Sequence, residues 1–169
     1  MACLPVMDLG HGPVIVLLHG VGVGPESYAE LARLLSVDRR VLVIHRPTRL
    51  DGGVALEEQA TAVAETMRRR EAGGATVVGV SGGATLALVL AIGPPAVPGD
   101  LVLHEPLVGD HAPALRARLA AAAGRARQGD AEALAVVRDV LGAATWDRLD
   151  PQARAQIEAM APVARSEIP

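Results

Sequence analysis

A serine flanked by glycines is the feature of this sequence best suited to covalent chemistry. The motif Gly79-Val80-Ser81-Gly82-Gly83 begins at the end of an apolar run and leads directly into an Ala- and Leu-rich segment with helical spacing. On so tight a strand-to-helix turn, a serine has a strained backbone and an exposed hydroxyl. Glycines two positions before and after it allow the strand and the helix to approach each other without collision. The helix N-terminus offers unpaired N–H groups to a developing oxyanion. The pattern predicts Ser81 as a nucleophile, and the alternative is a Gly-rich turn with an incidental serine.

A second loop, Leu17-Leu18-His19-Gly20-Val21-Gly22, also follows an apolar run. Ligands of open parallel sheets bind outside the carboxyl ends of the strands, so this loop and Ser81 are expected to share one crevice. We expect His19 to order the loop through side-chain hydrogen bonds rather than to titrate in catalysis.

Glu105 is a candidate acid because it follows the apolar run 101–103 and would lie at the same edge of the sheet. The alternative is that its carboxylate lines the pocket or binds loop backbone. The histidines at 45, 104 and 111 lack the spacing of metal ligands, and no metal site is predicted.

Val-rich runs and helical segments must position these residues. The runs are continuous rather than alternating, which is typical of strands buried on both faces, and they alternate with helical segments. This predicts a doubly wound, mostly parallel α/β sheet. The strands are expected at 14–18, 41–44, 76–80 and 101–103, the helices at 28–35, 54–70 and 84–92, and an antiparallel edge strand near 4–7.

The character of the chain changes after Pro106, where it becomes Ala- and Arg-rich without another strand-like run. We therefore expect a core over 1–106 and a helical cap over 107–169. Within the cap, Asp130 is predicted to cap one helix, and Asp150-Pro151 is predicted to begin another. Three apolar cap residues are expected to shape a substrate pocket: Leu134, Trp146 and Met160.

Composition argues against several classes of partner. The formal net charge of -3 gives no basic field for nucleic acid or an anionic membrane. The longest apolar stretch is too short to span a bilayer. A single cysteine, Cys3, cannot form an internal disulfide, and the N-terminus does not resemble a secretory signal. We expect a cytoplasmic protein that acts on a small molecule.

A dinucleotide-binding loop is a rival interpretation of the glycines at 20, 22 and 24. The G-x-G-x-x-G pattern fails, because its third glycine would fall at Pro25 or Ser27. An NADP-binding protein that holds the 2′-phosphate with Arg46 remains a minor alternative.

An apolar strand ending in His-Gly, followed about sixty residues later by G-x-S-x-G, resembles the α/β-hydrolase superfamily of esterases, lipases and thioesterases. The resemblance covers roughly 14–106. It implies that the backbone N–H groups of Val21 and Gly82 form an oxyanion hole, with Gly20 in the supporting loop. It also implies a serine hydrolase that acts on a small ester, thioester or related acyl substrate through an acyl-enzyme, without a cofactor. Haloalkane dehalogenases are similar in placing a carboxylate after the strand that Glu105 follows.

The resemblance breaks at the catalytic base. The family order is serine, acid, histidine, but the only histidines after Ser81 are His104 and His111, neither at the usual position. Three explanations compete: a fragment of a longer protein, a second chain that completes the sheet, or a non-catalytic binding or scaffold protein. We expect the first, an incomplete hydrolase fold whose unpaired edge at 101–103 favours a homodimer or a completing chain.

Overall fold

A five-stranded sheet forms the centre of the first of two units into which the contacts divide the chain. The structure is a computed structural model, and it describes residues 3–21, 23–46, 55–93, 97–106, 113–159 and 161–162. The first unit comprises residues 1–20, 24–47 and 51–107, and the second comprises 21–23, 48–50 and 108–169.

The sheet has the strand order β1-β3-β2-β4-β5, with β1 antiparallel to β3 and every other neighbouring pair parallel. The strands are β1 (Val6–Gly10), β2 (Val14–Leu18), β3 (Arg40–Ile44), β4 (Thr76–Val80) and β5 (Asp100–His104). This confirms the predicted mostly parallel sheet with an antiparallel edge. The edge strand begins later than expected, because the Leu4 N–H donates to Thr66 Oγ1 instead of to a neighbouring strand.

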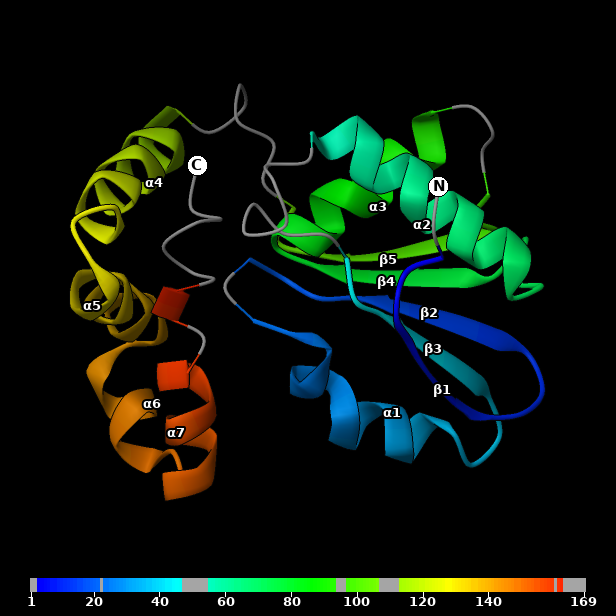
Figure 1. Ribbon diagram of the computed structural model, residues 1–169, viewed down its shortest axis with the longest axis horizontal. Coiled ribbons are helices and arrows are strands. Elements are labelled where there is room, and N and C mark those ends of the chain that lie inside the picture. Colours follow the sequence, from blue (N-terminus) through cyan, green and yellow to red (C-terminus); the bar gives the residue numbers. More distant parts are fainter. Residues whose placement is uncertain are drawn as a thin grey trace. The chain divides into compact units, whose positions relative to one another are not determined.

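Helices cover both faces of the sheet (Figure 1). The 3-10 helix η1 (Pro25–Tyr28) and helix α1 (Ala29–Leu35) precede β3, and α1 lies on one face. Helices α2 (Leu56–Arg69) and α3 (Gly82–Ile92) lie together on the opposite face. Each helix follows one of the parallel strands, which is the crossover arrangement expected from the alternating pattern.

Side chains that alternate along the central strands feed two separate cores. Leu18, Leu42 and Ile44 are fully buried against α2 and α3, together with Val63 and Met67 of α2. The intervening positions pack on the α1 side: Leu17, Val41 and Val43, with Ala32. Fully burying one such aliphatic side chain contributes about 1.5–3 kcal/mol. These strands are therefore apolar at every position because both faces are covered.

Strand β5 departs from the expectation of burial on both faces. Leu101 and Leu103 pack against the core beneath α2 and α3, but Val102 is 53% exposed. Val102 is the register partner of Val78, which packs in the cluster that contains α1 residues, so both side chains point to the α1 face. In the described part of the sheet, β5 has a neighbour on one side only. It is an edge strand with an apolar residue on an uncovered face.

The second unit is helical where it is described. Its helices are α4 (Pro113–Ala126), α5 (Asp130–Leu141), α6 (Ala143–Arg148) and α7 (Pro151–Ala159). Asp150 begins α7 as predicted, with its carboxylate accepting a 2.8 Å hydrogen bond from the Ala153 N–H. The prediction for Asp130 was wrong by one position: Gly129 is the N-cap, because its extended backbone precedes a helix that already includes Asp130. None of the described helices is long and apolar enough to cross a membrane.

A bidentate ion pair joins β1, the antiparallel edge strand, to β3. Arg40 on β3 donates from Nε to Asp8 Oδ1 (3.0 Å) and from Nη2 to Asp8 Oδ2 (2.8 Å). Its Nη1 also donates to the Arg70 carbonyl at the end of α2. The hydrogen bonds from Arg40 are the main reason that the pKa of Asp8 lies below its usual value. Strand β1, strand β3 and α2 are thereby joined at one corner.

We predict that Asp8→Asn removes part of the acid sensitivity of folding. The carboxylate stabilises the fold above its pKa in the unfolded chain, about 3.9, and that stability is lost as the pH falls through this value toward the lower folded pKa. Urea unfolding between pH 6 and pH 3 should show a flatter profile for Asp8→Asn, with a loss of about 1 kcal/mol at pH 6. The exposed Asp38, paired only with its neighbour Arg39, supplies the control Asp38→Asn, which should change little. An unchanged profile in Asp8→Asn would contradict the role of the pair.

The uncovered edge also predicts self-association. Unpaired strand groups beside an apolar side chain favour pairing with another copy, and a charged residue on an edge strand opposes it. Val102→Lys should therefore lower the weight-average mass in sedimentation experiments. Ile92→Lys is the matched control, because Ile92 is more exposed (82%) but ends α3. Equal effects of both substitutions, or a wild-type monomer at high concentration, would show that β5 does not mediate association.

Candidate active site

Ser81 occupies the turn between β4 and α3. Its backbone has φ 53° and ψ -120°, a conformation that residues with a Cβ rarely adopt. Ser81 stands at the N-cap of α3 but makes no side-chain capping hydrogen bond. A serine at this position ordinarily satisfies the helix N-terminus. Ser81 is half-buried, and in this strained turn its hydroxyl does not take the capping role.

Two glycines make this turn sterically feasible. A Cβ atom on Gly83 would lie 2.5 Å from the His19 carbonyl oxygen and still nearer to that of Leu18. A Cβ atom on Gly79 would lie 2.5 Å from the Gly83 oxygen and 2.7 Å from the Ala84 nitrogen. Real Cβ atoms essentially never approach backbone so closely. The first turn of α3 can therefore lie against the ends of β2 and β4 only because both positions lack a side chain.

Backbone hydrogen bonds hold the Ser81 turn on both sides. The Ser81 N–H donates to the His104 carbonyl at the end of β5 (2.8 Å). The Ser81 carbonyl accepts from the N–H groups of Ala84 (2.9 Å) and Thr85 (3.1 Å), which are the first bonds of α3. The N–H groups of Gly82 and Gly83 precede those bonds, so the helix ladder itself offers them no acceptor. Gly82 therefore stays the predicted oxyanion donor next to Ser81.

The His19–Gly20 loop continues β2 at the same edge of the sheet. His19 is fully buried, and its Nδ1 donates to the Gly20 carbonyl (3.0 Å). Arg46, which follows β3, is 4% exposed and donates from Nε to the His19 carbonyl (3.0 Å) and from Nη2 to the Gly20 carbonyl (3.1 Å). The side chain of His19 therefore orders its own loop, and Arg46 supports the loop from β3.

These contacts overturn the alternative role for Arg46. An arginine that reads a 2′-phosphate must present its guanidinium to a ligand. The guanidinium of Arg46 is instead buried and donates to protein carbonyls, with Nη1 on Gln59 Oε1 (3.1 Å). Nothing in its position suits NADP.

Glu105 directly follows β5 and has a positive φ of 52°. Its side chain is 81% exposed, and one oxygen lies 4.0 Å from His104 Nδ1. Because the His104 carbonyl accepts from the Ser81 N–H, His104 and Glu105 lie at the end of the strand next to Ser81. The carboxyl edge of the sheet thus brings together His19, Ser81 and Glu105. His111 lies outside the described residues, and Val21, half-buried after Gly20, stays a predicted oxyanion donor.

Known structures share this fold, although no protein-family model and no curated protein sequence matches the chain. A probable hydrolytic enzyme from Pseudomonas aeruginosa PAO1 is 19% identical, over 96% of this chain and 57% of its own, with a TM-score of 0.73. An α/β hydrolase fold protein from Burkholderia ambifaria is 20% identical, over 96% and 65%, with a TM-score of 0.73. A thermophilic esterase from Thermogutta terrifontis is 18% identical, over 98% and 63%, with a TM-score of 0.73.

The chain has the α/β-hydrolase fold. It spans between 57% and 65% of the length of these three proteins. At identities of 18% to 20%, the likeness establishes the fold and leaves the reaction to be inferred from the site.

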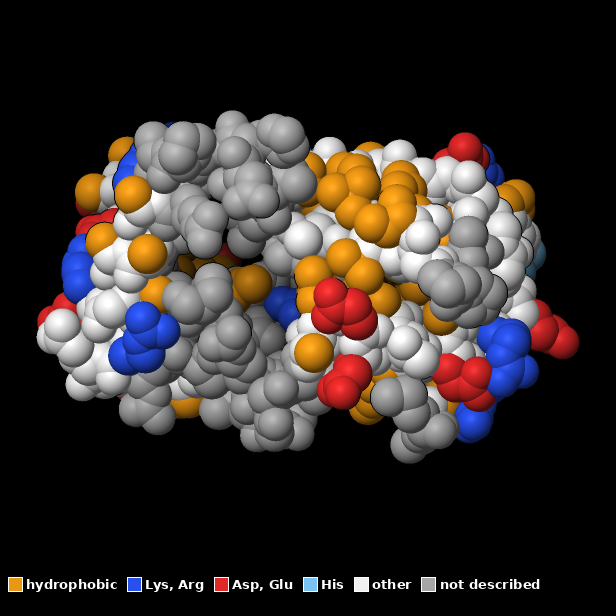
Figure 2. Space-filling view, turned by 90° about the horizontal axis from the view of Figure 1, so that it is seen from above, with side chains coloured by type: hydrophobic (Ala, Val, Ile, Leu, Met, Phe, Trp, Pro, Cys, Tyr) orange, Lys and Arg blue, Asp and Glu red, His pale blue; other side chains and the backbone are white. Residues whose placement is uncertain are grey.

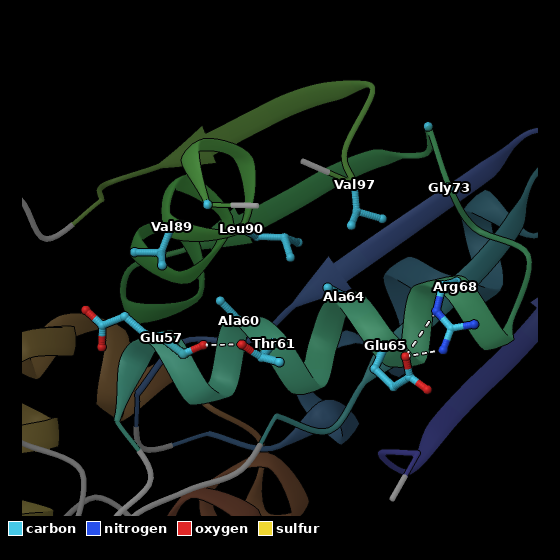
Figure 3. Close-up of a pocket in the computed structure, with 12 residues that line it drawn as sticks. Glu57, Ala60, Thr61, Ala64, Glu65, Arg68, Gly73, Val89, Leu90 and Val97 are labelled. Atoms are coloured by element: carbon cyan, nitrogen blue, oxygen red, sulfur yellow. Dashed lines mark hydrogen bonds and ion pairs between the residues drawn. The ribbon is translucent and has the colours of Figure 1, made fainter. Parts of the chain in front are cut away.

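One pocket of this hydrolase-fold unit is separate from the nucleophile turn. It has a volume of about 710 Å³ and lies on the side of α2 and α3, where Figure 2 shows hydrophobic side chains gathered among charged ones. Figure 3 shows its lining, with Ala60 and Ala64 from α2 facing Val89, Leu90 and Val97. None of the predicted site residues lines it.

The expected substrate-shaping residues fare differently. Trp146 is buried within the second unit, where Arg138 and Arg154 lie 5.2 and 5.7 Å from its ring centroid. Its ring is thus enclosed by its own unit, which leaves little surface for a ligand. Leu134 is half-buried, and Met160 lies outside the described residues. Among the described residues, no three His, Cys, Asp or Glu side chains are placed to share a metal ion.

We predict that Gly83→Ala destabilises the fold strongly. The new Cβ would collide with the backbone of β2, so α3 must move or the loop must open, and overpacking of this kind costs about 1–3 kcal/mol or more. Gly73→Ala is the matched control, because a Cβ there meets nothing within 4 Å. Urea unfolding should separate the two variants. Equal stability would mean that the close contact between α3 and β2 does not exist in solution.

Proposed function

We propose that this chain is the nucleophile-bearing part of a serine hydrolase that acts on a small ester, thioester or related acyl compound. The observation that carries the proposal is the conformation of Ser81. Its backbone is strained at φ 53° and ψ -120°, and its side chain makes no capping hydrogen bond to α3. Strain of this kind costs about 1–3 kcal/mol and is typical of functional sites. A turn that served only to connect β4 to α3 would be more stable with glycine at this position. The esterase among the similar structures supports the same class of reaction.

In the proposed reaction, Ser81 Oγ attacks the substrate carbonyl carbon as a base removes its proton. The carbonyl electron pair moves onto oxygen, and the N–H groups of Gly82 and Val21 donate to that oxyanion. The intermediate collapses to an acyl-Ser81 ester as the alcohol or thiol leaves, taking up the proton from the base. Water then attacks the acyl-enzyme by the same route and regenerates the serine.

The proposed reaction requires a base that takes the proton from Ser81 Oγ. In the described part of the chain, no histidine side chain is hydrogen-bonded to the Ser81 hydroxyl. We propose that the imidazole comes from outside the 169 residues, from further sequence or from a partner chain. Glu105 and His104 lie at the end of β5, the strand beside β4, and their exposure leaves them accessible to such a partner.

The same observation favours a second candidate of a different class, a protein that retains the hydrolase fold for binding. Without an imidazole, Ser81 keeps the high pKa of an alcohol, and the oxyanion hole alone preserves only about 10³–10⁴-fold catalysis over water in the best-studied triads. A binding protein would also tolerate the slow turnover that follows.

Covalent labelling separates the two candidates. We predict that a fluorophosphonate labels the full chain slowly and at Ser81 alone, whereas Ser27 and Ser36, whose hydroxyls donate to the backbone carbonyls of Gly24 and Arg33, stay unlabelled. Peptide mapping by mass spectrometry locates the adduct. Ser81→Ala should lose the label and keep the fold. Ser81→Gly should lose the label and gain about 1 kcal/mol in urea unfolding, because glycine accepts a positive φ.

Two outcomes would count against the proposal. Labelling that survives Ser81→Ala would remove Ser81 from the chemistry. An unlabelled wild-type chain, even when its missing base is supplied by added imidazole, would favour the binding protein.

A further inference from the structure

A buried guanidinium sits behind the loop that carries the proposed oxyanion donor. Arg46 is only 4% exposed, although it lies two residues after the end of β3, at the same edge of the sheet as Ser81. Burying a charge is costly unless hydrogen bonds compensate for it, and hydrogen bonds to a charged donor are stronger in an interior than in water. Two of the bonds that compensate here end on consecutive backbone carbonyls, those of His19 and Gly20. Arg46 is thus bound to this short stretch of backbone as well as to Gln59 of α2.

The Gly20 carbonyl is held from two directions. It accepts from Arg46 Nη2 at 3.1 Å and from His19 Nδ1 at 3.0 Å. The neighbouring His19 carbonyl accepts from Arg46 Nε at 3.0 Å and also lies against Gly83 of α3, where a Cβ would approach it to 2.5 Å. The loop is confined between the guanidinium and the first turn of α3.

The planar geometry of the peptide bond means that holding the Gly20 carbonyl also fixes the direction of the Val21 N–H. The Gly20 carbonyl and the Val21 N–H belong to the same planar trans peptide unit, so they point in opposite directions. When Arg46 and His19 bind the carbonyl, the Val21 N–H must point away from Arg46. A flipped peptide would place the carbonyl oxygen where the N–H should be and would leave Arg46 with unsatisfied buried donors.

We propose that Arg46 is a positioning residue that fixes the Gly20–Val21 peptide so that the Val21 N–H is presented as an oxyanion donor. This inference rests on the proposed function, since it assigns a task to a residue that does not touch the substrate. Gln59 assists, because its Oε1 accepts from Arg46 Nη1 at 3.1 Å and fixes the rotation of the guanidinium from α2.

The test compares two reactions of the same nucleophile that differ in whether an oxyanion forms. In the full chain with Cys3→Ser and Ser81→Cys, the thiolate can attack p-nitrophenyl acetate, forming a C–S bond as the carbonyl pair moves onto oxygen and p-nitrophenolate then leaves. The same thiolate attacks the CH₂ carbon of iodoacetamide and expels iodide, with no oxyanion at a carbonyl. The ratio of the two rate constants reports the oxyanion donors and cancels changes in thiolate access.

Arg46→Met, which keeps an unbranched apolar stem and removes the donors, should lower the acylation rate about 10- to 100-fold and leave alkylation within about twofold, since losing one oxyanion donor costs about 10²–10³ in other enzymes. Arg46→Lys should recover part of the loss. Arg40→Met is the matched control, because Arg40 also donates to a backbone carbonyl, that of Arg70, but at the β1 corner. Its rate ratio should equal that of the parent.

The outcomes separate this inference from the proposed function. If both rates fall together in Arg46→Met, or if neither falls, Arg46 has no positioning role. If wild-type Ser81 resists fluorophosphonate while the rate ratio still depends on Arg46, the peptide is positioned but the serine chemistry is wrong. Should Arg46→Met fail to fold, Gln59→Leu loosens the guanidinium without removing it and should shift the ratio in the same direction; an unchanged ratio there overturns the proposal.

Discussion

The absence of two Cβ atoms fixes the geometry on which the rest of this unit depends. Because Gly83 packs on the carbonyls at the end of β2 and Gly79 packs on the first turn of α3, helix and sheet meet at backbone distance. Ser81 lies between these contacts and inherits its strained backbone from them. The same approach places the His19 loop beside the N-terminus of α3, so one steric constraint brings Ser81 and this loop to a single edge of the sheet.

That edge combines strain with rigid support, which is the arrangement a preorganised site requires. Ser81 and Glu105 are two of the three described residues other than glycine with a positive φ, and both follow parallel strands. The strained backbone persists because hydrogen bonds to neighbouring strands hold the turn in place. One of them is the bond that the Ser81 N–H donates to the His104 carbonyl of β5. The stability lost at the turn is offset by the apolar cores on the two faces of the sheet.

The sequence could predict the parts of this structure that depend on local pattern. Continuous apolar runs marked the central strands, and G-x-S-x-G between a strand and a helix marked the turn. The sequence could not predict that strand β5 is half-exposed, because its apolar run resembles those of the buried strands. Val102 is exposed because the cluster of side chains packed with α1 does not extend over it. The hydrogen bonds of Arg46 were equally impossible to predict. An arginine after a buried strand suggested an anion site, whereas its acceptors are carbonyls 26 and 27 positions away.

The bonds of Arg46 also bear on the order in which the unit folds. They join the loop after β2, the end of β3 and Gln59 in the first half of α2, segments that are adjacent only once both crossovers are complete. Loop closure between distant segments must precede such contacts. The bond from Arg46 to Gln59 forms only when α2 has docked, and we expect the amide hydrogen exchange of the His19–Gly20 loop to follow the opening of that helix rather than that of the sheet.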